Sequence, residues 1–275
     1  MLIDYHTHHE RCGHAVGTLE EYVRQGIRIG LKQLGLSDHL PLIHVNPAEY
    51  YPEMAMPLEE LPRYVEECLE LKERYKGQIE LRLGLEADYI EGYEERIRVI
   101  LEPYPWDYLI GSVHFLGEWD ITDHRQVHGW KGKDSLEVYR QYYQAVRQSA
   151  ASEIYDIIGH MDVIKRFGYG PDTEEGRAEV RELERGALRQ IAEAGIAMEL
   201  NASGLSKPCA EMFPSRRVLE EAFRLGIPLT LGSDAHDPLK LGEGLAEARQ
   251  LLWDVGFREV VTFEGRRRVA VPLEV

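Results

Sequence analysis

Short apolar runs alternate with longer amphipathic stretches along the whole chain. Strand, helix and strand repeated about seven times is the pattern of a parallel sheet covered by helices. Seven of the apolar runs predict strands, over Leu2–His8, Gln33–Asp38, Glu80–Ala87, Tyr108–Phe115, Asp156–Met161, Ala197–Asn201 and Pro228–Gly232.

Three of the stretches between these runs have clear helical spacing and end in glycine, over residues 18–30, 61–77 and 177–195. Thr18 is a plausible N-cap before an acidic first turn, and glycine is a favoured helix terminator. No glycine-rich dinucleotide fingerprint follows the first strand. We therefore expect a closed α/β barrel rather than an open doubly wound sheet.

The length of 275 residues suits one barrel domain over residues 1–275, because barrels of this type commonly use about 250 residues. No repeat, low-complexity segment or interdomain linker interrupts the chain. Two insertions rich in aromatic residues stand out, near residues 40–62 after the second strand and 116–134 after the fourth. We expect both to be substrate loops.

The charge and cysteine content narrow the classes of function. A net charge of −16 disfavours binding to nucleic acid, because proteins that bind nucleic acid normally carry a basic surface. No apolar run approaches the roughly 20 residues of a membrane span. The N-terminus lacks the basic segment followed by an apolar segment that is typical of a secretory signal peptide. Three widely spaced cysteines suggest reduced thiols. We expect a cytoplasmic protein with no nucleic-acid or membrane partner, and a homo-oligomer stays open.

Histidines and carboxylates stand at or just beyond the ends of six of the seven predicted strands. Barrel enzymes build their sites at this end of the strands. The residues are His6, His8, His39, Glu86, His114, His160, Asp234 and His236. His6 with His8, and Asp234 with His236, are two residues apart, so each pair can face one ion. Imidazole and carboxylate without thiolate suit Zn, Fe(II) or Mn.

Glu86 and Asp234 are the strongest indication of a metal site, because a carboxylate on a buried strand is costly unless it binds a cation or hydrogen-bond donors. Other roles stay open at this stage. His39 could cap a helix, His14 could be a surface residue, and Asp4 could support the site or end a solvated strand. No ligand role is expected for His9, His44, His124, His128 or Cys12.

The order of these motifs resembles the PHP (polymerase and histidinol phosphatase) superfamily. The stretches "GSVHFLGEWDI", "DIIGHMDVIKRFG", "ELNASGL" and "LGSDAH" are similar to its histidinol-phosphatase members. The resemblance implies a distorted (β/α)7 TIM-like barrel that holds three divalent metal ions, Zn, Fe or Mn. It implies a first ion held by His6, His8, Glu86 and Asp234, a second by Glu86, His114 and His160, and a third by His14, His39 and His236.

The same resemblance implies a phosphomonoesterase that converts L-histidinol phosphate to L-histidinol and phosphate in histidine biosynthesis. A metal-bridging hydroxide would attack the phosphorus in line, so Cys12 and Ser233 would not be nucleophiles. Besides the ligands Glu86, Asp234 and His236, the expected catalytic residues are Asp38 and Asp162, as candidate proton donors to the leaving alcohol.

Arg166 and Lys207 are the candidate phosphate-binding residues, although they could also be solvated loop charges. The resemblance implies an arginine in the loop that here holds Ser206 and Lys207, so this loop departs from the family pattern. Phe115 and Trp119 could recognise the imidazole of the substrate or could form the core of an insertion.

Three alternatives remain at the level of the sequence. One is the same site acting on another small phosphomonoester or a nucleotide. Another is a metal-dependent amidohydrolase or deaminase, in which His14, His39 and His236 would have no task. The last is a metal-binding protein with a degenerate site, which predicts gaps among the nine candidate ligands, and none is missing.

Overall fold

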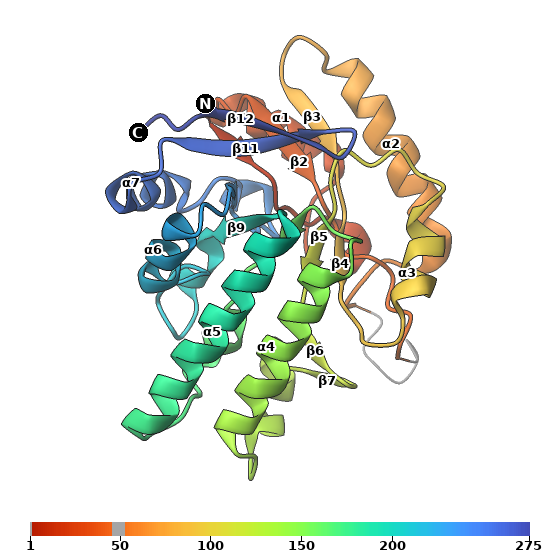
Figure 1. Cartoon of the computed structure of the whole chain (residues 1–275). Coiled ribbons are helices and arrows are strands. Elements are labelled where there is room, and N and C mark those ends of the chain that lie inside the picture. Colours follow the sequence, from red (N-terminus) through yellow and green to blue (C-terminus); the bar gives the residue numbers. More distant parts are fainter. Residues whose placement is uncertain (1, 46–52) are drawn as a thin grey trace.

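The computed structural model describes residues 2–45 and 53–275. Parallel strands lie in the middle and helices cover them on the outside (Figure 1). Part of the insertion expected near residues 40–62, the segment 46–52, lies outside the described residues.

The parallel strands form two sheets. The first has the order β1 (Ile3–Asp4), β2 (Gln33–Leu36) and β3 (Glu80–Leu83). The second has the order β10 (Leu229–Gly232), β9 (Ala197–Asn201), β8 (Ile157–Ile158), β5 (Ile110–Ser112) and β4 (Glu86–Asp88). Every neighbouring pair within them is parallel, as the alternating pattern of the sequence predicts.

Main-chain contacts join the two sheets at both edges. An isolated parallel bridge pairs Thr7 with Ala235, and another pairs His39 with Glu86. The N–H of Tyr5 donates to the carbonyl oxygen of Leu231 at 2.8 Å. The carboxyl ends of the strands of both sheets consequently open on one side of the molecule, where the candidate site lies.

All seven predicted strands exist, but most are shorter than predicted. The prediction of a first strand up to His8 is wrong, because β1 ends at Asp4, and Tyr5, His6 and His8 bond to β10 and to the chain that follows it. The predicted third strand is divided into β3 and β4. Between them, Gly84 packs against the ring of Tyr108, and a Cβ there would lie 2.2 Å from its Cζ.

The three predicted helices are present. Helix α1 (Leu19–Ile29) has Thr18 as its N-cap in a reciprocal capping box with Glu21, and it ends at Gly30 in the left-handed region. Helix α5 (Glu174–Ala194) begins three residues before the predicted range and ends at Gly195. Helix α2 (Leu61–Arg74) stops before Gly77, so glycine is not its cap.

The remaining helices and strands complete the outer layer. The helices are α3 (Glu94–Leu101), α4 (Ser135–Ala151), α6 (Arg216–Arg224) and α7 (Leu245–Val255). Two antiparallel pairs are β6 (Phe115–Leu116) with β7 (Trp119–Asp120), and β11 (Glu259–Glu264) with β12 (Arg267–Pro272). Helices α4 and α5 lie side by side (Figure 1).

Short 3-10 helices also occur, several of them in the segments that follow the parallel strands. They are η1 (Glu10–Cys12), η2 (Leu58–Glu60), η3 (His124–Trp130), η4 (Val163–Phe167), η5 (Ala202–Ser206) and η6 (Pro238–Lys240). Within the described ranges, no helix combines the length and apolar character that crossing a membrane requires.

A single apolar core holds the strands and helices together. At the end of the strands away from the candidate site, the rings of Tyr5 and Tyr108 lie 4.8 Å apart, and Phe263 of β11 packs on both. The Tyr108 hydroxyl donates to the carbonyl oxygen of Tyr5 at 2.7 Å. This buried aromatic layer supports the strand ends from below.

Candidate active site

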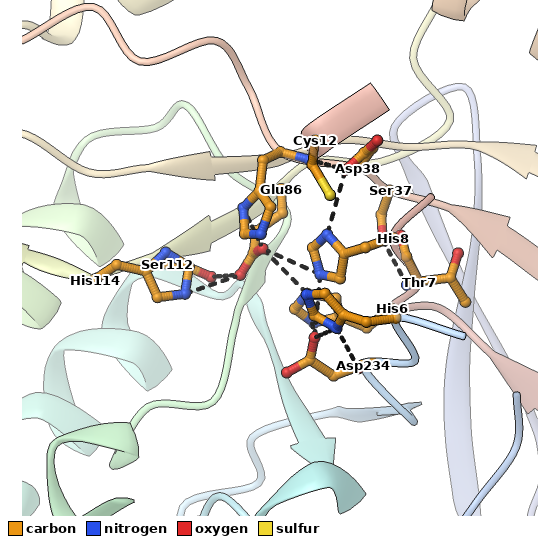
Figure 2. A network of polar contacts seen from close by, with 12 residues as sticks. His6, Thr7, His8, Cys12, Ser37, Asp38, Glu86, Ser112, His114 and Asp234 are labelled. Carbon is orange, nitrogen blue, oxygen red and sulfur yellow. Dashed lines mark hydrogen bonds and ion pairs between the residues drawn. The ribbon is translucent and has the colours of Figure 1, made fainter. Parts of the chain in front are cut away.

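The candidate ligands converge from strands that are distant in the sequence. His6 and His8 follow β1, His39 follows β2, Glu86 begins β4, His114 follows β5, His160 follows β8, and Asp234 and His236 follow β10. The exception is His14, which lies on the loop after η1. Figure 2 shows how the side chains of several of these residues point toward one another.

Glu86 lies at the centre of the group, and its side chain is 1% exposed. Its Oε1 atom lies 3.0 Å from His160 Nε2 and 3.5 Å from His114 Nε2. Its Oε2 atom lies 3.0 Å from His39 Nδ1 and 3.3 Å from His6 Nε2. One carboxylate therefore faces histidines from four separate strand ends, and Figure 2 shows two of them, His6 and His114, beside Glu86.

Asp234 forms the second carboxylate of the site. Its Oδ1 lies 3.1 Å from His8 Nε2 and 3.8 Å from His6 Nε2. The residue has a φ of 54°, which is uncommon for a residue other than glycine and often marks a functional position. Ser203 Oγ donates to its Oδ2 at 3.1 Å, which fixes the carboxylate.

His14 and His236 meet at the more exposed end of the site, with Nε2 atoms 3.1 Å apart. Four groups of three side chains bring their ligand atoms within 4.8 Å of one another. The groups are His6–His8–Asp234, His6–Glu86–His160, His39–Glu86–His114 and His8–His39–His236. The third ligand set expected from the resemblance differs from the last group, which has His8 in place of His14.

The buried polar atoms of the site fit divalent metal ions. His6 Nε2, both ring nitrogens of His8 and Glu86 Oε2 are buried and make no hydrogen bond within the described residues. Nearly all buried polar atoms in folded proteins have a partner, so these atoms need another one. Imidazole and carboxylate donors facing each other are ligands for Zn, Fe or Mn.

The electrostatics of the group are consistent with a site for cations. Burial alone would lower the pKa of His8, but the carboxylates of Asp234 and Asp38 raise it to about 9. The pKa of His114 rises to about 10 against the effect of burial, because Asp88 and Glu86 lie close. Metal ions would replace these protons between the same carboxylates.

Three further carboxylates lie near the outer nitrogen of a candidate ligand, and Glu199 and Asp88 approach it at about hydrogen-bond distance. Glu199 Oε1 lies 2.9 Å from His6 Nδ1, Asp88 Oδ1 lies 3.0 Å from His114 Nδ1, and Asp38 Oδ1 lies 3.5 Å from His8 Nδ1. Such partners fix the ring and its tautomer. Glu199 and Asp88 were not predicted, although Glu199 stands in an apolar run and Asp88 follows Glu86 by two residues.

A cavity of about 630 Å³ opens over the ligands. The three predicted substrate-binding residues, Arg166, Lys207 and Phe115, line it. Burial and the positive charges of Arg166 and Lys240 lower the pKa of Lys207, so three cations stand near one another. Lys240, which also lines the cavity, was not predicted.

The two predicted proton donors, Asp38 and Asp162, do not line the cavity. Asp38 contacts both His8 and His9, and these histidines hold its pKa below its usual range despite burial. Asp162 contacts Lys165 Nζ at 2.9 Å and accepts from the main-chain N–H of Ser215 at 2.9 Å. Both carboxylates lie behind the cavity wall.

The contacts of Asp4, Trp119 and Cys12 bear on roles that the sequence leaves open. Asp4 is buried and accepts hydrogen bonds from the N–H of Ser233 at 2.9 Å and from its hydroxyl at 2.5 Å, so it is not a solvated strand end. Trp119 packs edge-on against Trp130 inside its insertion rather than lining the cavity. Burial raises the pKa of the Cys12 thiol, which disfavours a reactive thiolate.

Comparisons with known proteins agree with this geometry. The PHP domain model matches residues 4–203. The chain is 39% identical over 267 residues to the probable histidinol-phosphatase of Deinococcus radiodurans, covering 97% of this chain and 98% of that protein. It is 33% identical to the histidinol-phosphatase of Bacillus subtilis, covering 87% and 95% of the two chains.

A solved structure is similar over nearly the whole length. It is the histidinol phosphate phosphatase of Lactococcus lactis subsp. lactis, complexed with zinc, L-histidinol and phosphate. The TM-score is 0.82 at 29% identity, and the match covers 98% of each chain.

Proposed function

The chain belongs to the PHP domain family, and on that premise we propose that it hydrolyses L-histidinol phosphate to L-histidinol and phosphate. The observation that carries the proposal is a set of histidines and carboxylates around Glu86, open to a cavity that Arg166 and Lys207 line. Relatives named as histidinol-phosphatases and the Lactococcus lactis complex support the choice of substrate. Histidine biosynthesis is the pathway this reaction serves.

Three divalent ions would be held by the side chains gathered at the strand ends. We assign His6, His8, Glu86 and Asp234 to the first, Glu86, His114 and His160 to the second, and His14, His39 and His236 to the third. Bound cations of this kind neutralise phosphoryl oxygens and lower the pKa of a coordinated water.

Arg166 and Lys207 are assigned to the phosphate. Both line the cavity, and Arg166 Nε is buried with no hydrogen-bond partner among the described residues. A guanidinium and an ammonium can share the oxygens of a phosphate, which carries two charges at neutral pH. Hydrolysis spreads charge over these oxygens, so both cations stabilise the transition state as well as the bound substrate.

Phe115 is assigned to the organic part of the substrate. Its ring lies on the cavity wall, and the ring of His44 packs edge-on against it with centroids 4.6 Å apart. This contact fixes the orientation of Phe115 from behind. A fixed aromatic face suits an imidazole ring, which L-histidinol phosphate carries and most metabolic phosphomonoesters lack.

We further propose that residues 1–275 form one distorted (β/α)7 barrel with insertions near 40–62 and 116–134. The contacts that join the two parallel sheets at both edges support a closed ring of strands. The cytoplasmic location and a homo-oligomeric state stay predictions.

The test is phosphate release from L-histidinol phosphate by zinc-loaded protein, compared with phosphoserine, glycerol phosphate and a nucleoside monophosphate. We expect kcat/KM for L-histidinol phosphate to exceed that of each other ester by at least about a hundredfold, since a matched site discriminates strongly. Similar values across the panel would keep the phosphoesterase chemistry and remove the substrate assignment. Activity on an amide and on none of the phosphate esters would favour an amidohydrolase.

A further inference from the structure

Glu199 contacts more than one part of the candidate site, whereas a carboxylate that only orients one histidine needs a single contact. We propose that Glu199 is a positioning residue that couples two metal positions, so that losing it weakens both together. The inference rests on the metal centre of the proposed function, but it concerns zinc binding rather than the reaction.

The first contact is with the imidazole of His6. Both oxygens of Glu199 lie close to His6 Nδ1, at 2.9 Å and 3.0 Å. A carboxylate on Nδ1 keeps the proton there and leaves Nε2 as the ligand atom. His6 Nε2 is the buried atom that faces Glu86 and Asp234, so Glu199 aims His6 into the site.

The second and third contacts reach two other candidate ligands. The main-chain N–H of His160 donates to Glu199 Oε2 at 3.2 Å, which ties down the start of the loop that carries this histidine. Asn201 Nδ2 lies 2.9 Å from Glu199 Oε1 and 3.3 Å from Asp234 Oδ2. Glu199 thus contacts His6 and His160 directly and reaches Asp234 through Asn201.

These ligands belong to two different groups. His6 and Asp234 share a group with His8, whereas His6 and His160 share a group with Glu86. His6 is common to both groups, and Glu199 is the only carboxylate of the described residues that holds its outer nitrogen. A shift of Glu199 would therefore disturb both groups, unlike a shift of Asp88, which holds His114 alone among the ligands.

The surrounding backbone makes room for this carboxylate. At Gly232 in the neighbouring strand β10, a Cβ would lie 2.2 Å from Glu199 Oε1. Gly232 is not in the left-handed region, so the backbone conformation does not require glycine. The absent side chain leaves space for Glu199, which is itself 1% exposed.

The experiment measures zinc binding to the full-length protein by competition with a chromophoric chelator, with elemental analysis after dialysis. The variants are Glu199→Ala and the isosteric Glu199→Gln. The matched control is Glu184→Gln, a buried carboxylate on α5 that contacts Arg217 and Tyr143 and belongs neither to the cavity lining nor to a ligand group. Circular dichroism checks the fold of each variant.

We expect Glu199→Ala to bind two zinc equivalents about 10–100-fold more weakly, with the third equivalent unchanged. Glu199→Gln keeps one oxygen for His6 but turns an amide N–H₂ toward the other donors, so both equivalents weaken by a smaller factor. Glu184→Gln should bind zinc as the wild type does. If Glu199→Ala does not fold, Glu199→Gln decides the question.

Weakening of one equivalent alone, or wild-type zinc affinity in the folded Glu199 variants, would overturn the proposal. An equal loss in Glu184→Gln would also overturn it, because the effect would then be general destabilisation. Wild-type protein that binds zinc but leaves L-histidinol phosphate intact would contradict the proposed function and not the role of Glu199.

Discussion

The Nε2 atoms of His14 and His236 lie 3.1 Å apart, although 222 positions separate the two residues in the chain. His14 Nδ1 lies 2.8 Å from the carbonyl oxygen of Glu53, so this nitrogen carries the proton and Nε2 is left as a ligand atom. His236 Nδ1 lies 2.9 Å from the carbonyl oxygen of Asp234 in the same way. Both rings therefore present a lone pair to the same point, as ligands of a shared cation do.

His14→Ala should consequently remove one zinc equivalent and leave the other two bound. Losing a direct ligand should lower kcat/KM for L-histidinol phosphate by more than the roughly 10–100-fold that loss of an outer partner causes. Elemental analysis and steady-state kinetics of the same preparation provide the check. His128→Ala, an exposed histidine away from the cavity, is the control. Full zinc content in His14→Ala would remove this residue from the metal set.

Glu86→Gln should abolish measurable activity and reduce the zinc content by at least two equivalents. The reason is that its two oxygens face different histidines, His160 on one side and His39 on the other. An amide has one acceptor oxygen and a weaker affinity for cations. Glu243→Gln, an exposed carboxylate on the cavity wall, should retain metal and activity. Near-native turnover of Glu86→Gln with three zinc ions bound would contradict the bridging position.

The sequence could predict where the ligands gather, because parallel strands place all their carboxyl ends on one side. Glu86 and Asp234 were identifiable from local pattern, since each follows an apolar run that buries it. Glu199 is likewise a carboxylate in an apolar run, but it lies inside β9 rather than at or beyond the end of the strand, where parallel strands bring side chains together. Its contact with His6 crosses 193 positions, which no local pattern encodes.

The role of Asp38 could not be predicted from its position beside His39. Adjacent residues on an extended chain point to opposite sides, so a neighbour of a ligand faces away from it. Asp38 accordingly turns toward His8 and His9 and does not line the cavity, and its role as a proton donor stays a prediction. His9 is buried and contacts Asp38, although it is not a candidate ligand.

His9→Ala should therefore destabilise the protein, because Asp38 would lose one of its two imidazole partners while staying buried. We expect a loss of about 2–4 kcal/mol in the free energy of unfolding, as is usual for a buried charge left partly unpaired. Urea denaturation of the zinc-loaded protein measures it. His128→Ala should stay within about 0.5 kcal/mol of the wild type. Equal stability of the two variants would show that the contact between His9 and Asp38 is unimportant.

Arg166→Ala and Lys207→Ala should each raise KM for L-histidinol phosphate and weaken inhibition by inorganic phosphate. Each variant removes a charge-assisted contact worth about 1.5–3 kcal/mol, which corresponds to roughly 10–150-fold in kcat/KM. Inhibition by L-histidinol, which has no phosphate, should change little. Lys32→Ala, an exposed lysine before β2, is the control. Unchanged phosphate inhibition in both variants would place the phosphate elsewhere in the cavity.

The most direct test of the central claim is a zinc titration of metal-free protein, with phosphate release from L-histidinol phosphate followed in the same samples. The account predicts little activity at low zinc, and a rise that is complete only when three equivalents are bound per chain. Full activity with one equivalent, or in protein shown to be metal-free, would contradict a phosphatase built on three metal ions.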